Sequence, residues 1–240
     1  IIYQDFAPLR YDSGNYAAVL DRAKAMIEYD KFIAEEQPRL RAEGKRVGIG
    51  LVCYVEGTGI GPYEGARVHV EPSGKVTVAT GVGTQGQGHY TSFAQVVAEQ
   101  LGVDVRRVRV VTGDTGEFNW GTGTFASRGA VVAGNAVNEA AKAVREKAIA
   151  LAAETLDVYE GDLEIANGRV QLKDMPQKGI SLGELAAQAN PLRGAVKPNT
   201  EPGLEATRYF GPQSGVTSNG AHAMIVEVDP ETMEIRIRKY

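Results

Sequence analysis

The spacing of hydrophobic residues switches along the chain between a helical period and a strand period. Apolar residues three and four positions apart predict helices, over residues 16–27, 31–41, 90–101, 130–156 and a short stretch after residue 181. Alternation with a period of two predicts strands and hairpins, over residues 47–57, 65–81, 105–114, 163–172 and 221–240. Because antiparallel hairpins are interspersed with helices, the pattern predicts an α+β fold rather than a doubly wound parallel sheet.

Two changes in the pattern suggest how the chain is organised. Residues 1–45 are mainly helical and polar on one side, so we expect a helical linker segment there, followed by one α+β domain over residues 46–240. A loop with proline and glycine is predicted over 190–203. The sequence starts at Ile1 instead of Met and stops at Tyr240 within a predicted strand, so we expect a piece of a longer protein.

Composition narrows the possible functions. The 240 residues carry a net charge of −4, which is unlike the basic footprint of nucleic-acid-binding proteins. No apolar run approaches the roughly 18 residues of a membrane span. The single cysteine, Cys53, excludes an internal disulfide and fits a reducing compartment, so we expect a cytoplasmic protein. Cys53 lies in an apolar run, which predicts a buried structural thiol.

The glycine-rich turn "GVGTQGQGH" follows a predicted strand and precedes a predicted helix. Gly81, Gly83 and Gly86 spell GxGxxG, the fingerprint of dinucleotide-binding proteins. That fingerprint also requires an acidic residue about 20 positions later at the end of a parallel strand. Asp114 comes too late, and the preceding strand is half of a predicted hairpin. A nicotinamide-dependent enzyme is therefore the weakest of the functions considered.

The same turn has a more general use. A glycine-rich turn at a helix N-terminus presents backbone N–H groups and the positive end of the helix dipole to a ligand. Gln85 and Gln87 add amides that both donate and accept hydrogen bonds. The alternative is a structural turn with exposed glutamines, but the density of glycines favours a ligand site.

A second loop of this kind precedes the long helix. "GDTGEFNWGTGTFASRG" spans residues 113–129 and ends in small and hydroxyl residues. Thr124 or Ser127 could simply cap the helix that follows. Two helix-start loops, each after a strand, favour one shared ligand with separated polar ends.

With both loops in view, the sequence resembles the molybdenum-binding large subunit of the xanthine dehydrogenase / aldehyde oxidase family, and most of all carbon monoxide dehydrogenase large subunits. The resemblance is carried by "YDSGNY", "GIGLVCYVEGTGIGPYEGARVHV", "TGVGTQGQGHYTSFAQVVAEQLGV", "VVTGDTGEFNWGTGTFASRGAVVAGNAV" and "GAHAMIVEVDPETMEI". These segments follow the family order over nearly the whole chain.

This resemblance implies a molybdopterin cofactor, in bacteria often its cytosine dinucleotide, and oxidative hydroxylation of a small-molecule substrate with oxygen from water. It also implies electron transfer to iron–sulfur and FAD partner subunits or domains. The cofactor-binding residues it implies are Gln85, Gly86, Gln87, Gly88, His89, Thr124, Phe125, Ala126, Ser127, Arg128 and Gly129. His89 either donates to the ligand or caps the helix. No direct metal ligand is implied.

The chain departs from the family pattern in segments that matter for catalysis. The family's glutamate base lies in a GxGE-type segment C-terminal to the closing hairpin, beyond Tyr240, so no carboxylate here is the base. Glu64, Glu99 and Glu117 are expected to have surface or structural roles. The upstream glycine-rich segment and the cysteine-bearing loop precede Ile1, and Cys53 inherits no role from that loop. We therefore expect the isolated chain to be inactive without the remainder of the large subunit.

Two other functions stay open at this point. The chain could be a short subunit of a split molybdenum hydroxylase, which a copurifying larger partner would support. It could also be a non-catalytic binding or assembly module on the same fold. The substrate class, whether carbon monoxide, an aldehyde or an N-heterocycle, is not determined by these residues.

Overall fold

The computed structural model describes residues 2–4, 7–9, 11–193 and 201–240. The chain folds into two compact units, one made of Ile1–Thr58 and Gly215–Tyr240 and one made of Gly59–Ser214. The boundaries of these units differ from the boundary expected between residues 45 and 46. The expected division into a linker and one domain stays a prediction.

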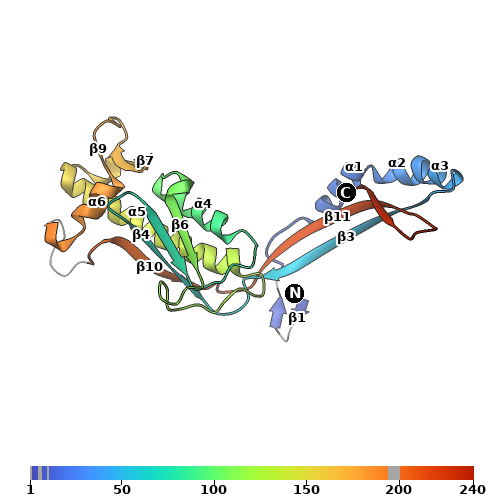
Figure 1. Cartoon of the computed structure of the whole chain (residues 1–240), viewed down its shortest axis with the longest axis horizontal. Helices are drawn as coiled ribbons and strands as arrows, with labels where there is room; N and C mark the ends of the chain where they lie inside the picture. The colour runs from blue at the N-terminus through green and yellow to red at the C-terminus, as the bar shows by residue number, and fades with distance from the viewer. Residues whose placement is uncertain (1, 5–6, 10, 194–200) are drawn as a thin grey trace. The chain divides into compact units, whose positions relative to one another are not determined.

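A four-stranded sheet forms the centre of the Gly59–Ser214 unit (Figure 1). Its order is β10 (Leu204–Phe210), β4 (Glu64–Val70), β5 (Val76–Thr80) and β6 (Val108–Thr112). The predicted hairpin is confirmed, since β4 and β5 pair antiparallel. Strand β10, which the pattern did not predict, pairs antiparallel with β4.

The strand β5 has a second neighbour that the sequence pattern did not reveal. It pairs parallel with β6, with Val78 opposite Val110, and α4 (His89–Leu101) connects the two strands. The sheet is therefore mixed, because β5 belongs to the predicted hairpin and also has a parallel neighbour. Parallel pairing needs a crossover connection, so the glycine-rich turn lies where β5 ends and the crossover helix begins.

Two helices build the core of this unit against the sheet. A π-helix (Gly129–Gly134) runs into α5 (Asn135–Leu156), which confirms the long predicted helix. One face of α5 is lined by alanines that are fully buried, among them Ala136, Ala140 and Ala148. They pack in one hydrophobic cluster with residues of the sheet such as Val68 and Val78. The alanine-rich sequence therefore serves close packing of helix on sheet.

Smaller elements complete the Gly59–Ser214 unit. The predicted hairpin is confirmed as β7 (Leu163–Ala166) and β8 (Arg169–Leu172), and β9 (Gly179–Ser181) extends it. Helix α6 (Leu182–Gln188) begins with a capping box between Ser181 and Glu184. Short 3₁₀ turns occur at Val105–Arg107, Glu160–Asp162 and Pro191–Arg193. The predicted loop over 190–203 lies partly outside the described residues.

The other unit has a three-stranded sheet in the order β12 (Ile235–Lys239), β11 (Val216–Val228), β3 (Arg46–Thr58). The predicted closing hairpin is confirmed by the pairing of β11 with β12. Short helical segments pack near these strands and share a small core with Val47 and Ile225. These segments are α1 (Tyr16–Ile27), α2 (Tyr29–Lys31), a π-helix (Phe32–Glu36) and α3 (Gln37–Ala42). A two-stranded hairpin pairs β1 (Ile2–Gln4) with β2 (Ala7–Leu9).

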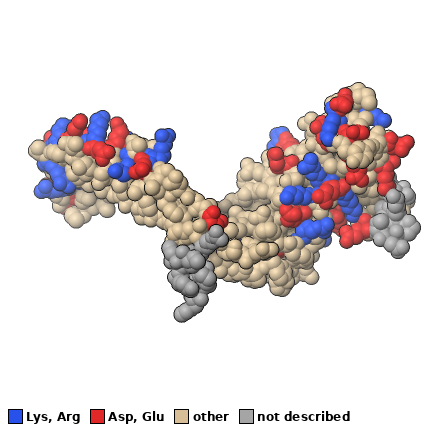
Figure 2. All heavy atoms as spheres, turned by 180° about the vertical axis from the view of Figure 1, so that it is seen from behind, with Lys and Arg blue, Asp and Glu red and all other residues tan. Residues whose placement is uncertain are grey.

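Part of this three-stranded sheet is uncovered within its own unit. Figure 2 shows charged side chains gathered over the helical part of the unit. The edge strand β12 is also charged, since Arg236, Arg238 and Lys239 are exposed, whereas the exposed residues 52–54 of β3 carry no charge. Val52 and Tyr54 of β3 are exposed, and so is Cys53. The prediction of a buried thiol was therefore wrong, because β3 is an edge strand of this sheet and an apolar run alone does not say what covers it. No helix within the described residues is long and apolar enough to traverse a lipid bilayer.

Candidate functional site

The first predicted loop connects the end of β5 to the start of α4. Its glycines let the backbone turn where other residues would be strained: Gly86 has φ 98° and Gly88 has φ 84°. Gly88 is the N-cap of α4, and no side chain caps this helix. The unsatisfied N–H groups of the first turn therefore remain available to a ligand, as the sequence pattern predicted.

The second predicted loop follows β6 and ends at the π-helix. Ala126 has φ 48° and Ser127 has φ 50°, a left-handed conformation that residues with a Cβ atom rarely adopt. Arg128 is the N-cap of the π-helix and makes no side-chain capping bond. The Thr124 hydroxyl donates instead to the Gly83 carbonyl of the first loop. Strained backbone and π-helical turns are both frequent at functional sites.

The two loops meet in space at three points. Backbones touch at Gly81 and Gly121, where a Cβ atom added to Gly81 would lie 2.4 Å from the Cα atom of Gly121. The Thr124 hydroxyl of the second loop donates a hydrogen bond to the Gly83 carbonyl of the first. A Cβ atom on Gly129 would lie 2.5 Å from Nε2 of His89. The predicted convergence of the loops is thus a property of the fold.

Part of each loop is exposed. Among the predicted cofactor residues, the exposed ones are Gln85, Gly86, Gln87 and Gly88 on the first loop and Phe125, Ala126 and Ser127 on the second. Space is open above the backbone of Gly86, Gly88 and Gly123, because an added Cβ atom would meet nothing within 4 Å. A large polar ligand could therefore approach the main chain of both loops, which fits a pterin cofactor with a phosphate group.

The Gln87 side chain shapes its own turn. Its Oε1 atom accepts hydrogen bonds from the Gln85 backbone N–H at 2.5 Å and from the Thr84 hydroxyl at 3.3 Å. The carbonyl half of the amide is thus used within the loop. The NH₂ half, for which the described residues show no partner, is left to donate to a ligand.

The His89 side chain packs inside the first loop, and its donation to a ligand stays a prediction. Its side chain is 5% exposed and its ring stacks on Phe93 with 4.8 Å between the ring centres. Burial lowers the pKa of His89, so the imidazole is neutral at pH 7. Its Nδ1 atom is buried and has no hydrogen-bond partner among the described residues. His89 does not cap α4; it packs the first loop against Gly129.

Arg128 lies inside the second loop rather than on its exposed side. Its side chain is fully buried and forms an ion pair with Glu64, which is also fully buried. The guanidinium carbon lies 5.0 Å from the centre of the Phe125 ring. Sequence reasoning assigned Glu64 only a surface or structural role. The one feature of the sequence that could have indicated a buried role for Glu64 is its position at the start of a strongly apolar strand.

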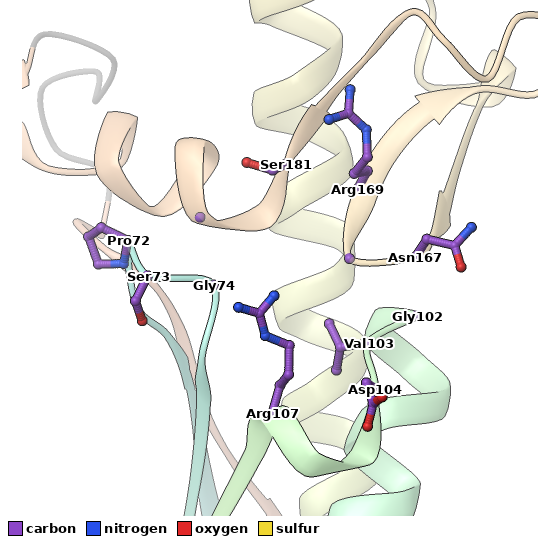
Figure 3. Close-up of a pocket in the computed structure, with 12 residues that line it drawn as sticks. Pro72, Ser73, Gly74, Gly102, Val103, Asp104, Arg107, Asn167, Arg169 and Ser181 are labelled. Atoms are coloured by element: carbon purple, nitrogen blue, oxygen red, sulfur yellow. The ribbon is translucent and has the colours of Figure 1, made fainter.

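A cavity of the Gly59–Ser214 unit lies away from both loops (Figure 3). Its volume is about 760 Å³, and Gly102 and Asp104 beyond the C-terminus of α4 line it together with Arg107 and Arg169. Helix α4 has 13 residues, so this cavity is separated from the first loop by roughly 20 Å of helix. Arg106 binds Asp104 through its side chain and keeps the pKa of that carboxyl well below its usual value. None of the predicted cofactor residues lines this cavity.

A second cavity of about 510 Å³ lies beside the second loop, lined by Tyr63, Asn119, Trp120 and Tyr209. The rings of Tyr63 and Trp120 stack with 5.3 Å between their centres. No three His, Cys, Asp or Glu side chains of the described residues come together as a metal-binding group.

Comparison with known proteins identifies the family of this chain. The family model described as a molybdopterin cofactor-binding domain matches residues 22–240. The carbon monoxide dehydrogenase large chain of Afipia carboxidovorans is 34% identical over 98% of this chain and 31% of its own length. The nicotine 6-hydroxylase large subunit of Paenarthrobacter nicotinovorans is 33% identical over 95% of this chain and 29% of its own length.

Solved structures lead to the same family. Quinoline 2-oxidoreductase from Pseudomonas putida 86 superimposes with a TM-score of 0.80 and 34% identity, over 93% of this chain and 30% of that one. This chain thus spans about 30% of the length of the proteins that it matches. The α+β fold and the resemblance seen in the sequence motifs are confirmed, and the chain belongs to the molybdopterin cofactor-binding domain family.

Proposed function

We propose that this chain forms one side of the cofactor site in the large subunit of a molybdenum hydroxylase. The observation that supports this most is the meeting of residues 81–89 with residues 120–129. Gly81 touches Gly121, and Thr124 hydrogen-bonds to Gly83. Two helix-start loops held together in this way present their backbone N–H groups and amides to one ligand.

The residues of the two loops would divide the work of holding the cofactor. Gln87 donates from its NH₂ group, and the backbone of Gly86 and Gly88 allows close approach because neither residue has a side chain. Thr124 to Ser127 form the opposing edge. When bound, the molybdenum centre supplies the redox chemistry by which a substrate is hydroxylated with oxygen from water. The chain's own residues bind and orient the cofactor.

The finer features of the proposal extend the resemblance. The cofactor would be molybdopterin cytosine dinucleotide, and electrons would pass to iron–sulfur and FAD subunits or domains. The substrate would be a small molecule. The carbon monoxide dehydrogenase and nicotine 6-hydroxylase relatives support an oxidoreductase assembly of this kind. A single cysteine supports a cytoplasmic location.

Cofactor analysis of the purified holoenzyme that contains this chain tests the proposal. We expect one molybdenum per large subunit by elemental analysis and release of cytidine monophosphate on acid hydrolysis. Release of another nucleotide would reject only the cytosine form. An enzyme active without molybdenum and pterin would reject the proposal as a whole. The isolated chain should retain no stable molybdenum, because one side of its pocket would be open to solvent.

A further inference from the structure

Glu64 and Arg128 form an ion pair at the base of the second loop. Glu64 is the first residue of β4, and Arg128 is the last residue before the π-helix. Both side chains have no exposed surface. Sixty-four positions separate them in the sequence, so the pair joins the start of a sheet strand to a loop from a distant part of the chain.

The pair also fixes both ends of residues 122–128, which form the last part of the second loop. Glu64 Oε1 accepts hydrogen bonds from the backbone N–H of Thr122 at 3.0 Å and of Gly123 at 3.1 Å. Arg128 Nη1 donates to the Gly123 carbonyl at 2.9 Å. One carboxylate oxygen of Glu64 therefore binds both ends of residues 122–128. Thr122 and Gly123 bond to it at the beginning of this segment, and Arg128 bonds to it at the end.

Arg128 anchors this arrangement to the chain that precedes β4. Its Nε atom donates to the Ile60 carbonyl at 3.1 Å, and its Nη2 atom donates to the Pro62 carbonyl. The guanidinium thus bonds both to residues 60–62, which precede β4, and to Gly123 of the second loop. Between the fixed ends, the residues Thr124 to Ser127 have little freedom to move as a body.

Stability alone does not account for this pair. Taking two charges out of water costs free energy that their attraction often fails to recover, and apolar residues of similar size are often as stable. The second oxygen of Glu64, Oε2, is buried and has no hydrogen-bond partner among the described residues. An unsatisfied buried acceptor is destabilising. The hydrogen bonds from Thr122 and Gly123 to the same carboxylate point instead to the fixing of one loop conformation.

The backbone conformation of this part of the loop is strained. Ala126 and Ser127 both have left-handed φ angles, which a free loop would relax. The same segment carries Thr124, whose hydroxyl holds the Gly83 carbonyl of the first loop. A shift of the second loop would therefore be transmitted to the first.

We infer that Glu64 is a positioning residue: with Arg128 it holds residues 122–128 in the strained conformation that presents their exposed edge to the cofactor. This inference rests on the proposed function, because it assigns the support of the same site. Glu64 itself does not touch the cofactor; it acts through the backbone of Thr122 and Gly123.

The test uses two variants of the holoenzyme. Glu64→Gln keeps the shape of the side chain and removes its charge. The double variant Glu64→Leu/Arg128→Met removes both charges and the loop hydrogen bonds while filling the same space. The control is Glu139→Gln, which breaks a half-exposed pair with Lys142 on α5 of the same unit. Molybdenum content, thermal midpoint, turnover per molybdenum and the Mo(V) EPR spectrum are measured for each.

For Glu64→Gln we expect an altered Mo(V) spectrum and at least a tenfold loss of turnover per molybdenum. The double variant should recover the thermal midpoint of wild type and still show the altered spectrum and the low turnover. Glu139→Gln should match wild type in all four measurements. A role in stability alone would restore turnover together with the thermal midpoint.

Two results would overturn the positioning role. One is a double variant with wild-type spectrum and turnover. The other is failure of both variants to fold, which would assign the pair to stability. Both are separate from failure of the proposed function, which would show as a wild-type enzyme without molybdenum. A loaded wild type with unaffected Glu64 variants would reject only the inference made here.

Discussion

Gly81 and Gly121 lie in backbone contact: a Cβ atom added to Gly81 would lie 2.4 Å from the Cα atom of Gly121, and one added to Gly121 would lie 2.6 Å from the Cα atom of Gly81. The two residues belong to different loops that each lead towards a helix. Because neither has a side chain, the loops approach closely enough for Thr124 to reach the Gly83 carbonyl. This contact sets the spacing of the candidate cofactor site.

Gly81→Ala should destabilise the chain by about 1–3 kcal/mol, because an extra methyl group in a packed contact forces the backbone to move. Gly83→Ala is the matched control, since a Cβ atom there would meet nothing within 4 Å. We expect that variant to remain within about 0.5 kcal/mol of wild type. Urea unfolding measures both. Equal stabilities for the two variants would contradict the close contact of the loops.

Gln87→Ala in the holoenzyme should lower activity while leaving the fold intact, since it removes an amide from an exposed turn. A hydrogen bond to a charged group is worth about 1.5–3 kcal/mol, which corresponds to a loss of about 10- to 100-fold. Steady-state kinetics per molybdenum and circular dichroism check the two parts. Gln177→Ala, at an exposed glutamine of the same unit, is the control. Wild-type turnover of Gln87→Ala would speak against the assigned site.

Ala126→Gly should stabilise the chain by roughly 0.5–1 kcal/mol, because the relief of a left-handed conformation exceeds the added backbone entropy of glycine. Ala130→Gly, at an exposed position of the π-helix, should instead destabilise it by about 0.5–1 kcal/mol. Thermal unfolding of both variants gives the comparison. A loss of stability in Ala126→Gly would mean that the loop is not strained as the φ angle of 48° indicates.

The buried imidazole of His89 predicts a dependence of stability on pH. Burial lowers the pKa of His89 below its ordinary value of 6.5, so between the two pKa values the unfolded chain binds a proton that the folded chain does not. The contribution of neutral His89 to stability is complete above pH 6.5 and is lost as the pH falls through the folded-state pKa. The free energy of unfolding of wild type should therefore fall more steeply than that of His89→Gln from about pH 7.5 to about pH 5. Parallel curves for the two proteins would show that His89 is not protected from protonation.

The sequence was sufficient for the elements with strong local signals. The alternation around the turn at Pro72 and Ser73 predicted the β4–β5 hairpin, and helical spacing predicted α4 and α5, because these patterns depend on neighbours along the chain. It also located both helix-start loops and, through its motifs, the family. What it missed depends on distant partners: the parallel pairing of β5 with β6, the strand β10, and the exposure of Cys53 on an edge strand.

The candidate site divides in the same way. Residue types and glycine spacing determined by themselves which two loops could hold a polar ligand, since open backbone and helix N-termini are local properties. Only the tertiary structure decided that Gly81 meets Gly121, that His89 packs on Gly129, and that Glu64 pairs with Arg128. The physical reason is that backbone contact and the burial of a charge are properties of pairs. The sequence shows which interactions each residue can make, and the tertiary structure determines which residues are its neighbours.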